Sequence, residues 1–391
     1  MPWNTFEIVW LFVLIFCFIA QMLFYWIVVA KPFQYMKSIA SMEFQQASGQ
    51  PPVSVIVSIK NSQPDWKQSL QDILEQDYPA FEVIAVTDKI SYTNEDELIR
   101  MKNRYPNLYT THVPEDTKNV SRKKLALTLG IKAAKYELLL FTECDCHTRS
   151  KDWISLMSSH FSDKKTVVLG FAAFENPSGL RYNFATYDYF FSNLQMISFA
   201  LFNHPYSGNG RNMAYSKKHF IKHKGFIKYR TLQQGEDDLF INEIATDENT
   251  AIELSPQSVT LTEINENTDW RQFKLDRMST QRFYQRGPVA FHRLEAGIRI
   301  TFYTALVFCF FSGGSYASFE DFLLPGTALV CFIARFVSQL FIINKINDLL
   351  QLKKFYLELF FFDLFQPFVN LYFFMYSVLK RQENYTYRYE K

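Results

Sequence analysis

One short segment of the chain concentrates side chains that can hold a metal ion. Residues 143–147 read Glu-Cys-Asp-Cys-His, directly after the apolar run YELLLFT at 136–142. Structural zinc usually takes four thiol or imidazole ligands from paired motifs, and the central sequence has no second such cluster. If the strand continues, Glu143 and Asp145 share one face and the cysteines share the other. Two explanations remain, a hard cation such as Mg²⁺ or Mn²⁺ on the two carboxylates or a solvated acidic turn.

Three further groups of charged residues favour the metal explanation. Asp88 ends another apolar run, and Lys123 and Lys124 open a helical pattern suited to the charge of a diphosphate. Far downstream, the segment Gly-Glu-Asp-Asp at 235–238 opens a further helical pattern. Alone, that segment would be explained as a helix N-terminus, where acidic side chains are stabilised. Together, the groups predict a site for a nucleotide diphosphate and a divalent cation.

Strands and helices alternate in the part of the chain that must position these residues. Short β-branched or apolar runs predict strands, and apolar residues at a helical period predict the helices between them. The expected strands are 53–59, 81–88 and 136–142, and the expected helices are 65–76 and 122–135. This alternation predicts a parallel sheet with helices on its faces. Ligands of such sheets bind beyond the carboxyl ends of the strands, where Asp88 and Glu143 lie.

The composition points to a membrane. The 391-residue chain has a net charge of only +2, which implies no nucleic-acid partner, yet 40 residues are Phe. Residues 8–30 carry no charge and are long enough to cross a hydrocarbon core of about 30 Å. A cleaved signal peptide is the alternative, but the run is long for one and no Lys or Arg precedes it. Lys31 and Lys37 follow it, so the positive-inside rule places the next domain in the cytoplasm.

The C-terminal third is apolar again, and three membrane segments are expected there, at about 298–313, 322–344 and 355–379. The last carries Asp363 and Pro367. It either spans the membrane or folds back as a re-entrant hairpin broken near these residues, and both arrangements fit the sequence. Cys144 and Cys146 are too close together for an ordinary disulfide framework, which agrees with a reducing compartment. The predicted layout is an anchor at 1–31, a linker at 32–52, a catalytic-type α/β domain at 53–290, membrane segments at 291–380 and a basic tail at 381–391.

The motifs of residues 50–290 resemble those of family 2 glycosyltransferases. This inverting, membrane-attached group includes the chitin, cellulose and hyaluronan synthases. The segments that carry the resemblance are QDYPAFEVIAVTD at 76–88, KKLALTLGIKAAKYELLLFTECDC at 123–146, SGNGRNMAY at 207–215 and GEDD at 235–238. The resemblance is greatest to membrane-bound bacterial members. It implies a Rossmann-like GT-A domain, a multi-pass protein of the cell inner membrane, and a role in envelope polysaccharide biosynthesis.

The resemblance also implies a role for individual residues. Asp237, following Glu236, would be the general base. Asp145 would bind Mg²⁺ or Mn²⁺ directly, with Glu143 at the first acidic position of that motif. The nucleotide-sugar, with UDP-sugars the first expectation, would contact Lys60, Asp88, Lys123 or Lys124, and Arg277. The acceptor region would contain Gly210, Arg211 and Asn212.

Departures from the family pattern limit what the resemblance implies. Glu143 stands where the family has Asp, and Asn61-Ser62 stands where it has Asn-Glu. The Q-x-x-R-W motif of processive members is replaced by KLDRM at 274–278, which keeps Arg277 but lacks the Trp. The expected activity is therefore transfer of one or a few sugars to a lipid-linked or envelope glycan acceptor. The alternatives are a processive polysaccharide synthase and a non-catalytic relative that binds nucleotide-sugars.

Overall fold

The computed structural model divides into two compact units. Unit 1 comprises Met1–Ser38 and Arg286–Tyr372, and unit 2 comprises Ile39–Gln285 and Phe373–Lys391. The structure describes residues 5–40, 50–60, 66–88, 90–114, 117, 120–175, 179–263, 270–312, 319–380 and 385. Residues 41–49 of the expected linker and all of the expected basic tail except Tyr385 lie outside this range, as do Asn61 and Ser62.

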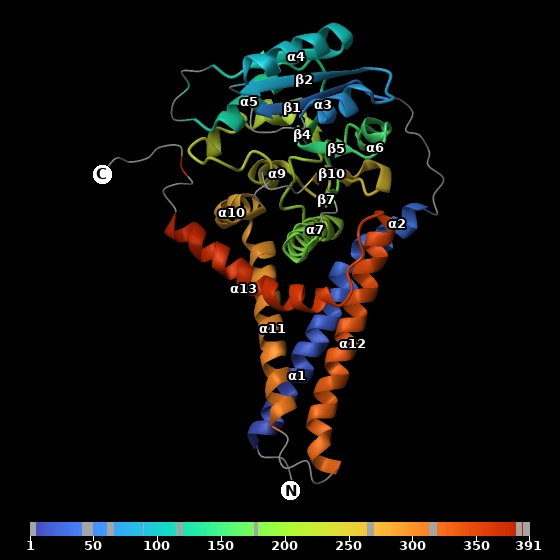
Figure 1. Cartoon of the computed structure of the whole chain (residues 1–391), viewed down its shortest axis with the longest axis vertical. Coiled ribbons are helices and arrows are strands. Elements are labelled where there is room, and N and C mark those ends of the chain that lie inside the picture. The colour runs from blue at the N-terminus through green and yellow to red at the C-terminus, as the bar shows by residue number, and fades with distance from the viewer. Residues whose placement is uncertain are drawn as a thin grey trace, which may run out of the picture. The chain divides into compact units, whose positions relative to one another are not determined.

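Unit 2 contains the predicted parallel sheet. Its first four strands are mutually parallel and are, in spatial order, β3 (Leu108–His112), β2 (Phe81–Asp88), β1 (Val53–Lys60) and β4 (Leu138–Glu143). The helices between them are α3 (Trp66–Leu74), α4 (Tyr92–Arg104) and α5 (Arg122–Ala133). Figure 1 shows these helices around the sheet. The expected strands and helices in this half are thus present, with ends shifted by one or two residues.

The sheet continues with an antiparallel strand, which the sequence analysis did not anticipate. Beyond β4 follow β8 (Met213–Ser216), β6 (Val167–Leu169) and β9 (Thr250–Ile252), with β8 antiparallel to both of its neighbours. A second sheet contains β5 (Cys146–Thr148), β10 (Thr260–Glu263) and β7 (Ala172–Glu175). The remaining helices of unit 2 are α6 (Trp153–Ser159), α7 (Leu180–Leu201), α8 (Lys217–Lys222), α9 (Asp238–Ile244), α10 (Trp270–Thr280) and the short η2 (Ile227–Tyr229), η3 (Pro256–Ser258) and η4 (Gln281–Phe283).

The core of unit 2 is built on both faces of β1. Val55 and Val57 belong to a buried cluster with the apolar side chains of α3 and α6. Ile56 points to the opposite face, where α5 packs at Gly130. A Cβ at Gly130 would lie 2.8 Å from Ile56 Cγ2, so the glycine permits the close approach of helix and sheet. Burial of both faces explains why β1 is apolar throughout rather than alternating.

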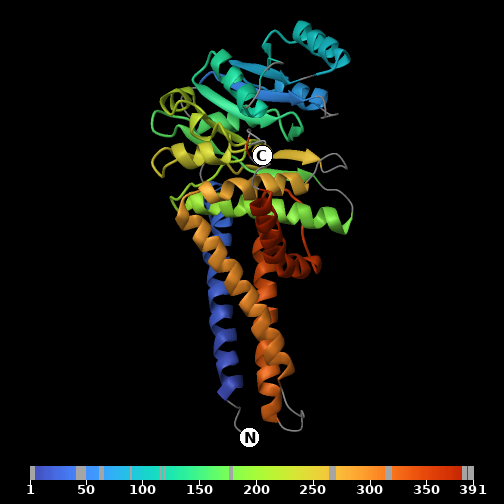
Figure 2. The same cartoon turned by 90° about the vertical axis from the view of Figure 1, so that its left-hand side faces the viewer.

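Unit 1 is built from long apolar helices. It contains α1 (Thr5–Leu23), the π-helical turn η1 (Phe24–Val29), α2 (Lys31–Ala40), α11 (Arg286–Phe311), α12 (Phe319–Leu349) and most of α13 (Glu358–Leu379). Figures 1 and 2 show α1, α11 and α12 running side by side. Four helices in the described part of the chain, beginning at Thr5, Arg286, Phe322 and Glu358, are long and apolar enough to cross a membrane. This is consistent with membrane association.

A buried, charge-balanced cluster links the helices of unit 1. The Asp363 carboxylate, fully buried in α13, pairs with Arg335 Nη2 of α12 at 2.8 Å and with Arg299 Nη1 of α11 at 3.3 Å. Tyr303 donates a hydrogen bond to it at 2.7 Å, and Arg299 also pairs with Glu295 at 2.5 Å. Helix α13 continues without a break through Asp363 and Pro367, so the expected break of a hairpin there is absent. Buried charges of this kind are tolerated only when paired, which here couples three helices.

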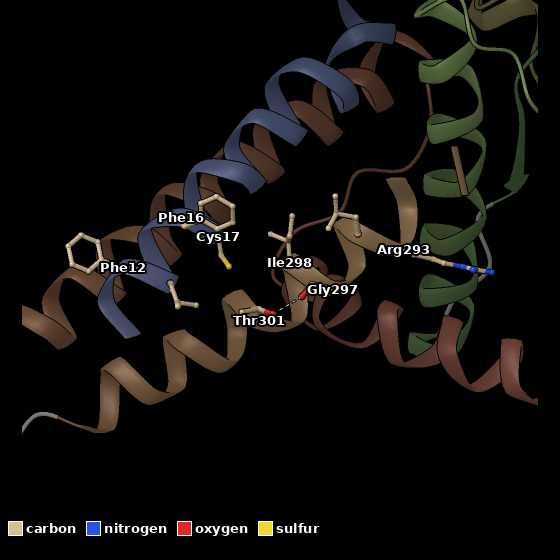
Figure 3. A pocket seen from close by; sticks show the side chains of 9 residues that line it. Phe12, Phe16, Cys17, Arg293, Gly297, Ile298 and Thr301 are labelled. Carbon is tan, nitrogen blue, oxygen red and sulfur yellow. Dashed lines mark hydrogen bonds between the residues drawn. The ribbon is translucent and has the colours of Figure 1, made fainter. Parts of the chain in front are cut away.

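An open apolar groove of about 570 Å³ lies between α1 and α11. Phe12, Phe16 and Ile298 line it, and Gly297 leaves space beside the α11 backbone. Figure 3 shows the Arg293 side chain directed away from the groove. The lining is that of a surface facing hydrocarbon.

Candidate active site

The carboxyl ends of the parallel strands bring the first predicted residues together. Lys60 is in register with Asp88 across β1 and β2, and Ser58 of β1 is in register with Glu143, the last residue of β4. The Asp88 carboxylate is held by Arg122 of α5, whose Nε and Nη2 lie 2.7 and 2.5 Å from Oδ1. Sequence analysis missed Arg122. Its position directly before the two lysines, opposite an acidic strand end, was the available signal.

The acids and thiols of residues 143–147 are separated, but not along the continued strand that was expected, because β4 ends at Glu143 and a turn at residues 144 and 145 leads to β5. Cys144 and Cys146 are buried, whereas Glu143 and Asp145 are partly exposed. The Cys146 thiol lies 3.2 Å from Thr262 Oγ1, and burial raises its pKa well above the usual range. Cys146 is therefore a protonated packing group, Cys144 belongs to the buried cluster around β1, and the carboxylates are the groups that face the site.

Each of these carboxylates contacts a basic side chain. Lys123 Nζ lies 2.8 Å from Glu143 Oε1 and 2.7 Å from Glu236 Oε1. Arg211 Nη2 lies 2.9 Å from Asp145 Oδ2 and 3.7 Å from Glu143 Oε2. A continuous line of alternating charges therefore runs through Asp145, Arg211, Glu143, Lys123 and Glu236.

The two adjacent lysines of α5 have different surroundings. Burial lowers the pKa of Lys123, but the carboxylates of Glu143 and Glu236 outweigh it and hold that pKa well above the ordinary value. Lys124 is 2% exposed and points the other way. Its ammonium donates to the carbonyls of Tyr229, Leu232 and Gln234 at 2.7, 2.8 and 2.7 Å. Lys123 is thus the lysine that faces the acidic site, and Lys124 holds the loop before Gly235.

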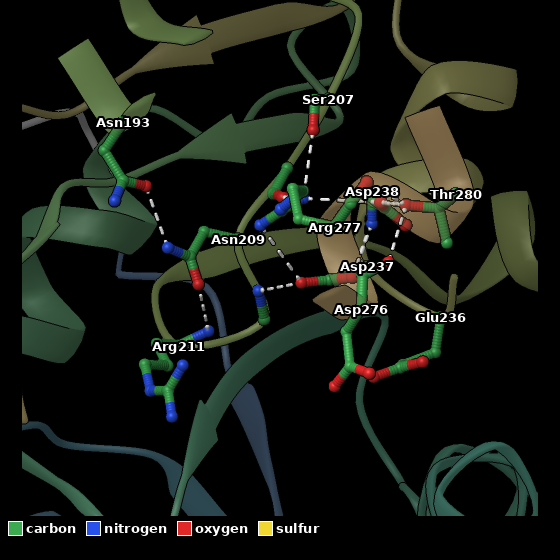
Figure 4. A network of polar contacts seen from close by, with 12 residues as sticks. Asn193, Ser207, Asn209, Arg211, Glu236, Asp237, Asp238, Asp276, Arg277 and Thr280 are labelled. Carbon is green, nitrogen blue, oxygen red and sulfur yellow. Dashed lines mark hydrogen bonds and ion pairs between the residues drawn. The ribbon is translucent and has the colours of Figure 1, made fainter. Parts of the chain in front are cut away.

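The two aspartates after Glu236 have opposite electrostatic character. Asp237 is the N-cap of α9 and accepts hydrogen bonds from the Asp238 and Gly210 amides at 2.7 and 3.0 Å. Burial raises its pKa, but the charges of Arg277 and Lys123 outweigh burial and lower it below the usual value. Asp237 is therefore ionised and held in place (Figure 4).

Asp238 is buried and accepts a hydrogen bond from the Tyr284 hydroxyl at 2.5 Å and another from Thr280. Burial and the adjacent charge of Asp237 raise its pKa to about 6. Asp238 therefore ties α9 to the segment after α10, while Asp237 remains the carboxylate available to a substrate.

The segment SGNGRN between α7 and β8 forms one wall of the site. Asn209 Nδ2 donates to Tyr189 and Asn193, and Gly210 supplies the amide that Asp237 accepts. Asn212 differs from the acceptor-region expectation. It is 1% exposed, its Nδ2 donates to the carbonyls of Phe171 and Ser258, and its Oδ1 accepts from Trp153. The structure thus places Asn212 in the interior, below Gly210 and Arg211.

Helix α10 carries the segment KLDRM, which was compared with the Q-x-x-R-W motif in the sequence analysis. Lys274, in place of Gln, forms a buried ion pair with Asp188 of α7, its Nζ lying 2.7 and 2.8 Å from the two oxygens. Arg277 donates to the Gly208 carbonyl at 2.9 Å and to Ser207 Oγ at 3.1 Å, and its guanidinium lies 3.7 Å from Asp237. Arg277 therefore holds the Asp237 carboxylate beside the SGNGRN segment.

Glycosyl transferase family 21 matches residues 10–384, nearly the whole chain. The chain belongs to glycosyl transferase family 21. The protein is accordingly a glycosyltransferase, while the expected kinship with chitin, cellulose and hyaluronan synthases stays a prediction. No curated protein matches the chain by sequence.

One solved structure supports the fold of this family 21 glycosyltransferase. The mannosyltransferase PcManGT from Pyrobaculum calidifontis, in complex with GDP-Man and Mn²⁺, superposes with a TM-score of 0.56 at 16% identity, covering 94% of this chain and 99% of that one. S. aureus TarS 1-349 is also similar, with a TM-score of 0.38 at 16% identity over 77% of this chain and 89% of that one. The first comparison shows the α/β GT-A-type fold that the sequence predicts.

The carboxylates of Glu143 and Asp145 fit a divalent cation that takes its remaining ligands from phosphate and water. Glu143 and Asp145 direct one oxygen each toward the same nitrogen, Arg211 Nη2, so the two carboxylates converge on a point. Within the described residues, no group of three or more His, Cys, Asp or Glu side chains is arranged to hold a metal. Two carboxylates plus phosphate and water oxygens match the coordination that Mg²⁺ prefers.

Sequence analysis also missed Asp276 of α10. Figure 4 shows its carboxylate beside that of Glu236. Burial raises its pKa to about 7, opposed by a hydrogen bond from Gln272 and reinforced by the charge of Glu236. It lies next to Arg277 within KLDRM, which was the only sequence signal.

Proposed function

We propose that this family 21 enzyme is a membrane-anchored, inverting glycosyltransferase. It moves a sugar from a nucleotide-sugar, UDP-sugars being the first candidates, to a hydroxyl of a lipid-linked or envelope glycan acceptor at the cytoplasmic face. The observation that carries the proposal is the line of alternating charges from Asp145 to Glu236, which ends beside the ionised Asp237. A metal-binding acid pair and a base are thereby adjacent.

Asp237 acts as the general base. One carboxylate oxygen accepts the proton of the acceptor hydroxyl as the hydroxyl oxygen forms a bond to the anomeric carbon. The bond from that carbon to the diphosphate oxygen breaks, and its electron pair leaves with the diphosphate. Because attack is opposite to departure, one displacement inverts the anomeric configuration. The lowered pKa of Asp237 keeps the base ionised at neutral pH, and the Gly210 amide and Arg277 fix its orientation.

The leaving diphosphate needs positive charge, for which Lys123 at the start of α5 and Lys60 at the end of β1 are the candidates. Lys123 stands between the two acidic motifs, and Lys60 ends β1 opposite Asp88, where the nucleoside is expected to bind. A divalent cation on Asp145 and Glu143 supplies further charge to the diphosphate when bound. The complex of PcManGT with GDP-Man and Mn²⁺ supports a nucleotide-sugar and a divalent metal.

The membrane helices support an acceptor that is itself at the membrane. Lys31 and Lys37 follow the first apolar helix, and Lys353 and Lys354 follow α12. This distribution favours a cytoplasmic catalytic domain. The missing Trp of the Q-x-x-R-W motif favours addition of one or a few sugars over polymer synthesis.

Transfer by purified full-length protein in lipid vesicles tests the proposal. Radiolabelled UDP- and GDP-sugars are supplied with bacterial lipid extract, in Mn²⁺ or in EDTA. The expected result is metal-dependent release of nucleotide diphosphate with label moving to the organic phase, in a product whose anomeric configuration by NMR is opposite to that of the donor. Consumption of no nucleotide-sugar under any of these conditions, or retention of configuration, contradicts the proposal.

A further inference from the structure

The position on which the two metal-motif carboxylates converge is occupied by a side chain of the protein itself. Arg211 Nη2 lies 2.9 Å from Asp145 Oδ2 and 3.7 Å from Glu143 Oε2. The other two oxygens are also engaged. Glu143 Oε1 accepts from Lys123, and Asp145 Oδ1 lies 3.3 Å from the Cys146 thiol. A divalent cation therefore has to displace a resident donor.

Among the side chains that contact these oxygens, Arg211 is the one least required for the structure. Its side chain is 9% exposed, and its Nε is buried without a hydrogen-bond partner among the described residues. Its guanidinium carbon lies 5.3 Å from the Phe273 ring centroid, so one side of the group packs against an aromatic face. By contrast, Lys123 joins two separate acidic motifs. A buried guanidinium with an unused donor is oriented by the acids and not by a hydrogen-bond network of its own.

The charges explain why such a group is useful. Glu143 and Asp145 are held close together at a strand end, where two uncompensated carboxylates repel each other. A guanidinium stays protonated at any physiological pH, so it neutralises the pair whenever no metal is bound.

We propose that Arg211 is an internal counter-ion that lies where Asp145 and Glu143 would hold a divalent cation and that it competes with the metal for these two carboxylates. The affinity of the enzyme for Mn²⁺ is then set by Arg211 as much as by the acids. Metal binding releases the guanidinium, which becomes available to the anionic donor. The inference rests on the proposed metal site and adds the residue that tunes it.

Binding of Mn²⁺ alone, in the absence of nucleotide, tests the inference without reference to activity. Free Mn²⁺ is titrated against the full-length protein in detergent and followed by electron paramagnetic resonance. Arg211→Met removes the counter-ion at similar size and is expected to tighten Mn²⁺ binding at least about tenfold. Arg211→Lys keeps the charge and is expected to stay within about threefold of the wild type. Arg122→Met, which removes a comparable cation from Asp88, is the matched control and is expected to change Mn²⁺ affinity less than about twofold.

The outcomes separate this inference from the proposed function. Unchanged or weaker Mn²⁺ binding by Arg211→Met overturns the inference, while metal-dependent transfer by the wild type would leave the proposed function standing. If neither protein binds Mn²⁺ and transfer persists in EDTA, the metal site of the proposed function fails as well. Asp145→Asn in the Arg211→Met background should abolish the tighter binding, and retention there would place the ion elsewhere and overturn the inference. Arg211→Gln serves in the same assay if Arg211→Met does not fold.

Discussion

Replacement of Asp237 by Asn removes the proposed base at almost constant size. The carboxylate accepts two backbone amides, those of Asp238 at 2.7 Å and Gly210 at 3.0 Å. Asn keeps one oxygen, so one amide loses its acceptor, which costs about 1–3 kcal/mol of folding free energy. Loss of a general base slows the chemical step by about 10²- to 10⁴-fold, or roughly 2.7–5.4 kcal/mol of activation free energy.

The assay must separate chemistry from binding. We expect single-turnover transfer with Asp237→Asn to fall by at least about a hundredfold. Donor affinity, measured by thermal shift with the nucleotide-sugar, should change by less than about threefold, since positive charge around the diphosphate is retained. Turnover equal to that of the wild type would refute the assignment of the base.

The matched control is Asp238→Asn at the next residue. Its folded-state pKa of about 6 exceeds the model-peptide value of 3.8. A raised carboxyl pKa means that the group contributes full stability below about pH 3.8 and loses it as pH rises through about 6. Asp238→Asn should retain a transfer rate within about tenfold of the wild type. Its melting temperature should fall less than that of the wild type as pH rises between these two values. A loss of transfer as large as that of Asp237→Asn would show that the two acids had been assigned wrongly.

Four further outcomes follow from the geometry. Lys124→Met should lower the melting temperature by roughly 6–15 °C, because two buried carbonyls and one partly buried carbonyl lose a charged donor. In the wild type, donor KM should rise about fivefold as pH increases through 7, because ionisation of Asp276 places negative charge beside the diphosphate site. Asp276→Asn should abolish this rise. Lys274→Met should cost about 3–5 kcal/mol of folding free energy, measured by denaturant unfolding in detergent, by leaving Asp188 buried and unpaired. Asp363→Asn should cost a similar amount, about 3–5 kcal/mol, in the thermal unfolding of unit 1.

Each of these has a control within the chain. Lys123→Met should raise donor KM with a smaller loss of melting temperature than Lys124→Met, and the reverse order would contradict the different roles of the two lysines. The donor KM of Asp276→Asn should not depend on pH between 6 and 8. If the variant kept the pH dependence of the wild type, a group other than Asp276 would be responsible for it. For the buried pairs, the exposed Lys228→Met, which loses a partner in Glu243, should cost less than about 1 kcal/mol. Equal costs at the three positions would contradict the importance of burial.

Local sequence determined the elements of the parallel half of unit 2. β-branched runs and helical spacing placed 53–59, 81–88 and 122–135 within two residues of the observed strands and helix, because these patterns depend on near neighbours in the chain. Apolar length likewise identified the helices that are long and apolar enough to cross a membrane. The short strands β6 and β9 escaped prediction, since three-residue strands carry almost no periodic signal.

Tertiary structure decided what each charged residue contacts. Whether Lys123 or Lys124 faces the acids depends on the rotation of α5 about its axis, which Gly130 and Ile56 set by packing. The pairing of Arg211 with Asp145 and of Lys274 with Asp188 joins residues far apart in sequence, and local spacing contains no information on them. A continued strand was expected to separate the thiols of residues 143–147 from the acids, yet the separation arises across the turn between β4 and β5, which leaves the acids partly exposed. Their neutralisation by Arg211 required the fold, because charge partners are chosen by distance in space.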